Sequence, residues 1–280
     1  MLNINTNYAA AFAANAASKV TSDLDTSMER LSTGNRINYA RDDAAGLAIS
    51  TRLENEIKGL ATASRNAADA QSMIDTADGA LAETNNILLR MRELAVQSAN
   101  GTLLQSDRNA LDAEFQALEA EIDRIDSNTS WAGNTLFDGS ANVFQVGTKD
   151  GSSNRISQTI ANMASSAIID TVTVGGVAGQ AVDVTTQARA QLAITEVDEA
   201  IGRVSAERGN LGAVSNRLSS TMANLDQVAV NLSASKGRIQ DTDFAAETGN
   251  LAKGQILQQA ATAMLAQANA SKQNVLALVR

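Results

Sequence analysis

The residues best suited to chemistry in this sequence are two pairs of carboxylates, each placed just before a long helical pattern. Asp42 and Asp43 precede one pattern, and Asp241 and Asp243 precede another. Paired carboxylates can perform acid–base catalysis or bind a metal ion. They also stabilise the start of a helix, where aspartate accepts hydrogen bonds from free backbone N–H groups. Helix capping is favoured, because no histidine accompanies either pair and no third carboxylate accompanies the first.

Composition argues further against catalysis. The 280 residues include no histidine and no cysteine, which removes the commonest general base and metal ligand, thiol chemistry and disulfides. The sequence also lacks a glycine-rich loop of the kind that cradles phosphate. We therefore expect no enzymatic activity, no metal and no cofactor. Hydrolytic or transferase activity that depends on Asp42 or Asp43 would support an enzyme instead.

The distribution of charge limits the partners. The net charge is −9, but only Lys19 is charged within the first 22 residues, and only Lys272 and Arg280 are charged within the last 27. The acidic middle argues against nucleic acid as a partner. No apolar run is long enough to predict a membrane span, and the N-terminus lacks the basic and apolar segments of a secretory signal peptide.

A seven-residue repeat dominates the sequence. Apolar side chains recur at this spacing in two long stretches that contain no proline. Such spacing predicts amphipathic helices with a narrow apolar seam, as in coiled coils. We predict one helix over 44–98 and another over about 188–237. The repeated positions are Leu53, Leu60, Ala67, Ile74, Leu81, Leu88 and Ala95 in the first, and Val197, Val204, Leu211, Leu218, Leu225, Leu232 and Ile239 in the second.

Shorter patterns complete the predicted fold. Helices are expected over 5–31, 106–128 and 243–280, and a hairpin pairs 143–146 with 155–157. The fold class is therefore mainly α: the N- and C-terminal halves form a long antiparallel helical bundle with a small β-hairpin-containing insert. The predicted divisions are terminal helices, 1–43 and 238–280; a long-helix core domain, 44–160 and 188–237; and a short variable surface insert, 161–187.

The two ends of the chain indicate self-assembly. Both are rich in alanine and nearly free of charge, so a pair of such helices buries little apolar surface per turn. They should be marginal alone and stable only when many copies pack them into a shared core. The leading hypothesis is therefore a structural assembly subunit.

Several long motifs closely resemble those of bacterial flagellins, in the order found in that family, over about residues 1–160 and 190–280. They are LSTGNRIN at 31–38, DDAAG at 42–46, RMRELAVQSANG at 90–101, QILQQA at 255–260, LAQAN at 265–269 and NVLALVR at 274–280. Two departures are visible. The proline that many flagellins have before the final helical turn is absent near Ser271, and only about residues 161–188 could replace the large outer domains of many members.

The resemblance implies a short flagellin with inner and core-tube domains, which polymerises into the flagellar filament for swimming motility. The terminal helices would form an inner tube and the long helices a surrounding tube. Export would pass through the flagellar type III apparatus, without a cleaved signal peptide, to an extracellular filament. Expected partners are further copies of the chain, a flagellin chaperone, the cap and hook–filament junction proteins, the export apparatus and the vertebrate Toll-like flagellin receptor. A hook–filament junction protein, which shares flagellin-like termini, is the alternative.

The first candidate site lies on the first long helix. At about 100° per residue, Arg90, Leu94 and Gln97 fall opposite the apolar seam, which predicts an exposed outer face. In flagellins this face makes contacts between subunits and is read by the Toll-like receptor, and Glu114 matches the same pattern. Leu89 departs from it, because receptor-activating members often have glutamine there.

Two further sets complete the candidate residues. An apolar seam of the last helix is expected to line the inner tube and to bind the chaperone before export: Ile256, Leu257, Met264, Leu265, Val275 and Leu278. The polar insert offers solvent-facing hydroxyls for O-glycosylation, and an unmodified loop is the alternative. The hydroxyls are those of Ser165, Ser166, Thr171, Thr173, Thr185 and Thr186.

Overall fold

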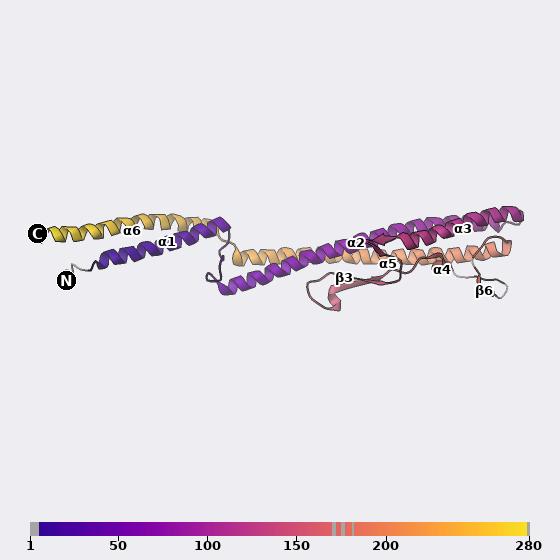
Figure 1. The fold of residues 1–280 in the computed structure, drawn as a ribbon, viewed down its shortest axis with the longest axis horizontal. Helices are drawn as coiled ribbons and strands as arrows, with labels where there is room; N and C mark the ends of the chain where they lie inside the picture. Colours follow the sequence, from indigo (N-terminus) through magenta and orange to yellow (C-terminus); the bar gives the residue numbers. More distant parts are fainter. Residues whose placement is uncertain (1–5, 170–171, 175–176, 181, 279–280) are drawn as a thin grey trace. The chain divides into compact units, whose positions relative to one another are not determined.

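The computed structural model describes residues 6–169, 172–174, 177–180 and 182–278, and helices dominate it (Figure 1). The helices are α1 (Tyr8–Thr33), α2 (Ala44–Ser98), α3 (Gln105–Asn128), α4 (Ser165–Ile168), α5 (Gln187–Gln240) and α6 (Phe244–Leu278). The strands are β1 (Ser130–Trp131), β2 (Asn134–Thr135), β3 (Ala141–Gln145), β4 (Arg155–Thr159), β5 (Val172–Val174) and β6 (Val177–Gln180). Contacts divide the chain into two compact units: unit 1 contains Met1–Ile57 and Val230–Arg280, and unit 2 contains Lys58–Ala229.

The predicted helices are confirmed, with boundaries that differ by a few residues at most. The helix predicted over 44–98 is α2 itself, and those predicted over 106–128 and 188–237 correspond to α3 and α5. α1 begins later than expected, where Asn7 Oδ1 accepts a backbone N–H of the first turn at 3.1 Å. It ends at Gly34, whose φ of 74° is the left-handed conformation that stops a helix.

In unit 2, α2 and α5 lie side by side and antiparallel, and their apolar seams form its core (Figure 1). Arg92 pairs with Asp198 at 2.6 Å, and Arg208 pairs with Asp78 at 2.7 Å, so the register of the two helices is defined. The predicted seam positions are buried along unit 2, where each buried leucine contributes roughly 1.5–3 kcal/mol. They are Leu60, Ala67, Ile74, Leu81, Leu88, Ala95, Val197, Val204, Leu211, Leu218 and Leu225.

α3 covers a second side of α2. Its Phe115 and Ile122 are fully buried in the same core. Its Arg108, also buried, donates from Nη2 to the carbonyl of Asn100 at 2.8 Å and from Nε to the carbonyl of Ser98 at 3.3 Å. Carbonyls at the end of a helix lack partners within it, so Arg108 closes the end of α2. α2 is therefore packed on two sides.

The described residues between α3 and α5 include three short antiparallel strand pairs. β3 pairs with β4, with Phe144 opposite Ile156, which confirms the hairpin predicted from the sequence. β1 pairs with β2, and β5 pairs with β6. The turn between β1 and β2 uses two left-handed residues, Ala132 and Gly133.

Carboxylates of α3 hold the insert in place through its backbone. Asp126 accepts the N–H of Met163 at 2.8 Å, and Asp123 accepts that of Ser165 at 2.7 Å. Asp112 accepts the N–H of Val184 at 2.9 Å. Burial raises the pKa of the Glu119 carboxyl on the same helix, because the charged form is disfavoured away from water. The insert therefore follows a defined path at both ends.

In unit 1, α1 and α6 form an antiparallel pair (Figure 1). Asn7 Nδ2 donates to the carbonyl of Ala268 at 3.3 Å, and Arg30 lies 3.9 Å from Glu247 toward the opposite ends of the helices. The segment after α1 and the segment before α6 are joined by an isolated antiparallel bridge between Asn35 and Asp241. The two terminal segments are thus connected at the point where both leave the helix pair.

Candidate assembly surfaces

One carboxylate of each pair, Asp43 and Asp243, caps a helix, as favoured from the sequence. Asp43 Oδ1 accepts the N–H of Gly46 at 2.8 Å at the start of α2, and Asp243 Oδ1 accepts two N–H groups at the start of α6, at 2.9 and 3.2 Å. Asp42 accepts the N–H groups of Asn38 and Tyr39, and these bonds hold the pKa of its carboxyl below the ordinary value. In the described part of the chain, no three carboxylates gather as metal ligands would.

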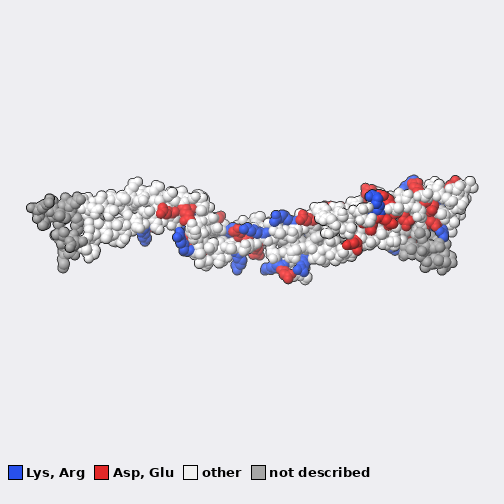
Figure 2. Space-filling view, in the orientation of Figure 1, with Lys and Arg blue, Asp and Glu red and all other residues white. Residues whose placement is uncertain are grey.

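The surface of the α1–α6 pair is apolar and carries few charges. Figure 2 shows most lysine, arginine, aspartate and glutamate side chains on other parts of the chain. Among the described side chains, six large apolar ones of this pair are more than half exposed: Phe12 (79%), Tyr8 (74%), Ile256 (66%), Met264 (64%), Met28 (54%) and Phe244 (54%). Single exposed apolar residues are common, but several on one helix pair are typical of a surface that binds another protein.

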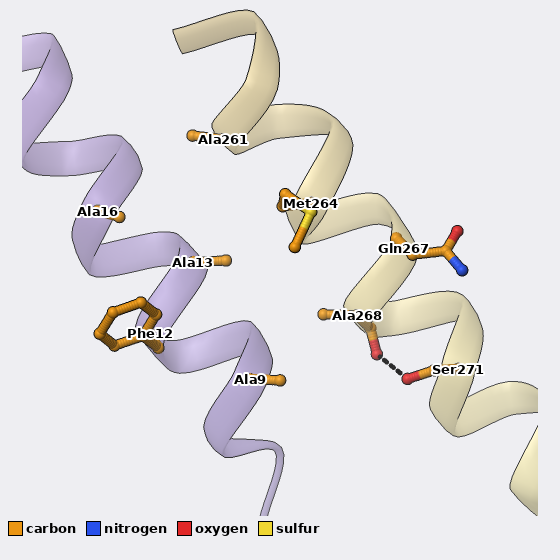
Figure 3. Close-up of a pocket in the computed structure, with 9 residues that line it drawn as sticks. All are labelled: Ala9, Phe12, Ala13, Ala16, Ala261, Met264, Gln267, Ala268 and Ser271. Carbon is orange, nitrogen blue, oxygen red and sulfur yellow. Dashed lines mark hydrogen bonds between the residues drawn. The ribbon is translucent and has the colours of Figure 1, made fainter. Parts of the chain in front are cut away.

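An open groove of about 390 Å³ runs between α1 and α6. It forms because the facing side chains are mostly alanines, which are too short to fill the space between two helices. Figure 3 shows Ala9, Ala13 and Ala16 of α1 facing Ala261, Met264 and Ala268 of α6. The α1 alanines were not among the residues predicted as a site, although their spacing of three and four residues is the signal that places them on one helix face.

The predicted seam of the last helix lies on α6 and remains incompletely covered. Leu257 is 44% exposed and Leu265 is half-buried, beside the more exposed Ile256 and Met264. Val275 and Leu278 also belong to α6, but their side chains lie outside the described residues. The described seam residues therefore retain apolar surface that a second molecule could cover.

An ion-pair network marks the predicted patch on α2. Arg90 donates to Glu114 of α3 at 2.8 Å and to Glu93 at 2.9 Å. The hydrogen bond to Glu114, the stronger influence, and the bond to Glu93 raise the pKa of the Arg90 guanidinium. Gln97, like these three side chains, is exposed. The structure thus brings Arg90 and Glu114 together on an accessible surface of unit 2.

The prediction that Leu94 lies on an exposed outer face is wrong. Leu94 is 1% exposed and belongs to the core of unit 2. Leu94 lies opposite the seam that packs against α5, but α3 covers this second side of α2. Leu89, in contrast, is 46% exposed. The signal for a second buried side was present in α3, whose apolar Phe115 and Ile122 require a surface to pack against.

The insert hydroxyls are less accessible than the sequence suggested. Ser166 and Thr186 are exposed, but Ser165 is only 5% exposed, because this turn is held against α3. Thr185 is half-buried and donates to Asp183 at 2.8 Å. Thr171 and the side chain of Thr173 lie outside the described residues. The expectation of solvent-facing hydroxyls is therefore wrong for Ser165.

Comparison with known proteins decides the family. A model of the bacterial flagellin N-terminal helical region matches residues 4–142, and a model of the bacterial flagellin C-terminal helical region matches residues 194–279. The chain belongs to the bacterial flagellin family. The flagellin resemblance read from the motifs is confirmed, and so is the mainly helical fold with its small hairpin region.

Individual flagellins are similar along most of the chain. The flagellin of Halalkalibacterium halodurans is 45% identical over 253 residues, which cover 90% of each chain. The flagellin of Bacillus subtilis is 42% identical over an alignment of 308 residues that covers 100% of each chain. The solved structure of a putative flagellar hook-associated protein from Vibrio parahaemolyticus has a TM-score of 0.58, covers 71% of this chain and 100% of that chain, and is 17% identical, which shows a shared fold alone.

Membership of this family defines the function at a coarse level. The chain is a structural subunit that polymerises with its own copies into the bacterial flagellar filament. The comparisons give no support to the hook–filament junction alternative over flagellin. Among the described residues, no helix combines the length and apolarity needed to cross a membrane.

Proposed function

We propose that the α1–α6 pair is the surface through which this flagellin joins the filament. In this proposal, residues 1–43 and 238–280 form the inner tube, and 44–160 and 188–237 form the surrounding tube. The insert at 161–187 lies on the outer surface. The observation that carries the proposal is the exposure of Phe12 and Met264 beside an alanine-lined groove whose lining residues are uncharged.

Physical reasoning supports this choice of surface. Burial of apolar area drives association, and the scarcity of charge means that few ions must lose water when copies pack together. Alanine permits close approach of helices, so a side chain of a neighbouring subunit can enter the groove. The contacts between copies are head-to-tail and continue indefinitely, as a filament requires.

The same exposed surface requires protection before assembly. We propose that a cytosolic flagellin chaperone binds the seam of α6, and that the chain then leaves unfolded through the flagellar type III apparatus. The cap and hook–filament junction proteins are the partners at the ends of the extracellular filament. Exposed apolar stripes promote aggregation, which is the physical reason for a chaperone.

A second surface is proposed around Arg90, Gln97 and Glu114. Its exposed ion pair offers charge-assisted hydrogen bonds to a neighbouring subunit or to the Toll-like flagellin receptor. Leu89, where receptor-activating members often have glutamine, places an exposed apolar side chain at the edge of this surface. Leu94 supports this second surface only indirectly, because its side chain is buried beneath it.

The proposed assembly surface is tested with Phe12→Asp and Met264→Asp, alone and combined. Both side chains are mostly exposed, so the monomer should keep its helix content and unfolding midpoint. Each substitution should raise the critical concentration for polymerisation by about 10- to 100-fold, because an apolar side chain can no longer be buried. Phe12→Leu is the matched control and should polymerise almost normally. An unchanged critical concentration for the double variant would overturn the proposal.

A further inference from the structure

Four glycines within the long helices of unit 2 have no packing reason to be glycine. They are Gly79 of α2 and Gly202, Gly209 and Gly212 of α5, and a Cβ added at any of them would meet no atom within 4 Å. Glycine weakens a helix more than any other residue except proline. Alanine would fit at each position and strengthen the helix, so the glycines lower the local stability of α2 and α5 without a compensating contact in the subunit.

These glycines fall within one stretch of the α2–α5 pair. Arg208 pairs with Asp78, and Arg92 pairs with Asp198, so residues 78–92 of α2 run beside residues 198–208 of α5. An open groove of about 470 Å³ is found at the Asp78 end of this stretch. Its lining includes Gly209 and Gly212. The packing of the pair is therefore incomplete where the helices are weakest.

Two buried polar atoms in the same stretch weaken the packing of the helix pair further. Glu207 is only 9% exposed and occupies a seam position of α5, between the fully buried Val204 and Leu211. Among the described residues, neither Glu207 Oε1 nor Asn85 Oδ1 has a hydrogen-bond partner, although both atoms are buried. A buried carboxylate oxygen without a donor is unfavourable compared with the leucine or valine found at neighbouring seam positions.

We propose that residues 76–86 of α2 and 202–212 of α5 form a joint at which the paired helices bend. Weak helix propensity, an open groove and unpartnered buried atoms coincide there, and each of them lowers the free energy needed to open or bend the segment. Beyond the joint, toward the C-terminal end of α5, Leu218 and Leu225 continue the buried seam. The Arg208–Asp78 pair is partly exposed, and a long arginine side chain can follow a bend without losing its partner.

Hydrogen exchange on the monomer tests the joint independently of filament assembly. Backbone amides of 76–86 and 202–212 should exchange about tenfold or more faster than those of 60–70 and 216–225, because they open locally. Gly79→Ala with Gly209→Ala should slow exchange in the joint by about threefold or more. The control, Asn55→Ala with Ser220→Ala, places alanine at exposed sites of the same two helices and should leave the joint unchanged. Equal exchange in joint and flanks, or equal slowing by the control, would overturn the proposal.

A second variant tests the buried carboxylate. Glu207→Leu should raise the thermal unfolding midpoint by about 3–8 °C and slow exchange in the joint, because an apolar side chain fits a seam position better than an unpartnered carboxylate. Glu199→Leu, at an exposed position of the same helix, is the control and should change neither quantity. A lower midpoint for Glu207→Leu would show that the carboxylate stabilises the seam, and it would contradict the proposed joint.

Discussion

Arg90 of α2 donates two hydrogen bonds to one carboxylate oxygen of Glu114 in α3, at 2.8 and 3.0 Å. This pair joins two helices that also share the core beneath them. Because both side chains are about half exposed, the pair contributes little to the stability of the monomer. We propose that its role is to hold a planar guanidinium at a fixed position on an accessible surface, where a partner can contact it.

Arg90→Ala should therefore separate binding from folding. The free energy of unfolding of the monomer should change by less than about 1 kcal/mol, as is typical when an exposed ion pair is removed. If the patch contacts a neighbouring subunit or the receptor, binding should weaken by about 1–3 kcal/mol. The measurements are the critical concentration for polymerisation and the affinity of the monomer for the receptor ectodomain. Wild-type values in both assays would show that the patch has neither role. A defect in assembly alone would indicate that this chain does not bind the receptor, and Leu89, which stands where receptor-activating members often have glutamine, would explain that loss.

Leu94→Asp should act on the monomer. Placing a carboxylate at a position that is 1% exposed should destabilise unit 2 by more than about 4 kcal/mol, because a buried charge without a partner is added to the loss of apolar contacts. Chemical denaturation followed by circular dichroism measures this. Leu89→Asp, at a position that is 46% exposed, is the control and should be nearly neutral. Equal stability of the two variants would contradict the buried position of Leu94.

Removal of about 20 residues from either end should abolish polymerisation and leave unit 2 helical. The ends contribute to unit 1, whereas the buried seam from Leu60 to Leu225 lies in unit 2. Electron microscopy detects filaments, and circular dichroism detects the remaining helix. Normal filaments from either truncated chain would contradict this expectation.

Chaperone binding should depend on the α6 seam. Leu257→Asp combined with Leu265→Asp places charge within the apolar stripe and should weaken chaperone affinity by about tenfold or more. Calorimetry with a purified flagellin chaperone measures the change. Gln255→Ala, at an exposed position on the opposite side of the same helix, is the control. Undiminished binding by the double variant would place the chaperone site elsewhere.

Glycosylation of the insert should be limited to accessible hydroxyls. Among the described side chains, Ser166 and Thr186 are exposed, whereas Ser165 is buried. If the insert is modified, peptide mass spectrometry of native filaments should locate the glycan at an exposed position and leave Ser165 unmodified. An intact mass equal to the 29.2 kDa of the sequence would exclude modification altogether.

The long helices could be predicted well because their signal is repeated many times. Seven-residue spacing from Leu60 to Ala95 determines the seam of α2, and one atypical residue such as Thr84 does not disturb it. Contacts made by a third element could not be predicted in this way. Leu94 and Ser165 are both buried by α3, and periodicity within one segment carries no information about which other segment covers it. The alanine groove was missed because alanine fits almost any helix contact.

Asp112, Asp123 and Asp126 of α3 accept hydrogen bonds from main-chain N–H groups of the insert. Every amino acid except proline carries the N–H group that these bonds require, so the three bonds themselves do not depend on side-chain identity. The side chains of Met163, Ser165 and Val184 are constrained instead by their burial. Substitutions at exposed positions of the insert, such as Ser166, can therefore accumulate while its path past α3 stays the same. In evolutionary terms, the subunit can change the exposed side chains of its surface loop while its core residues stay the same.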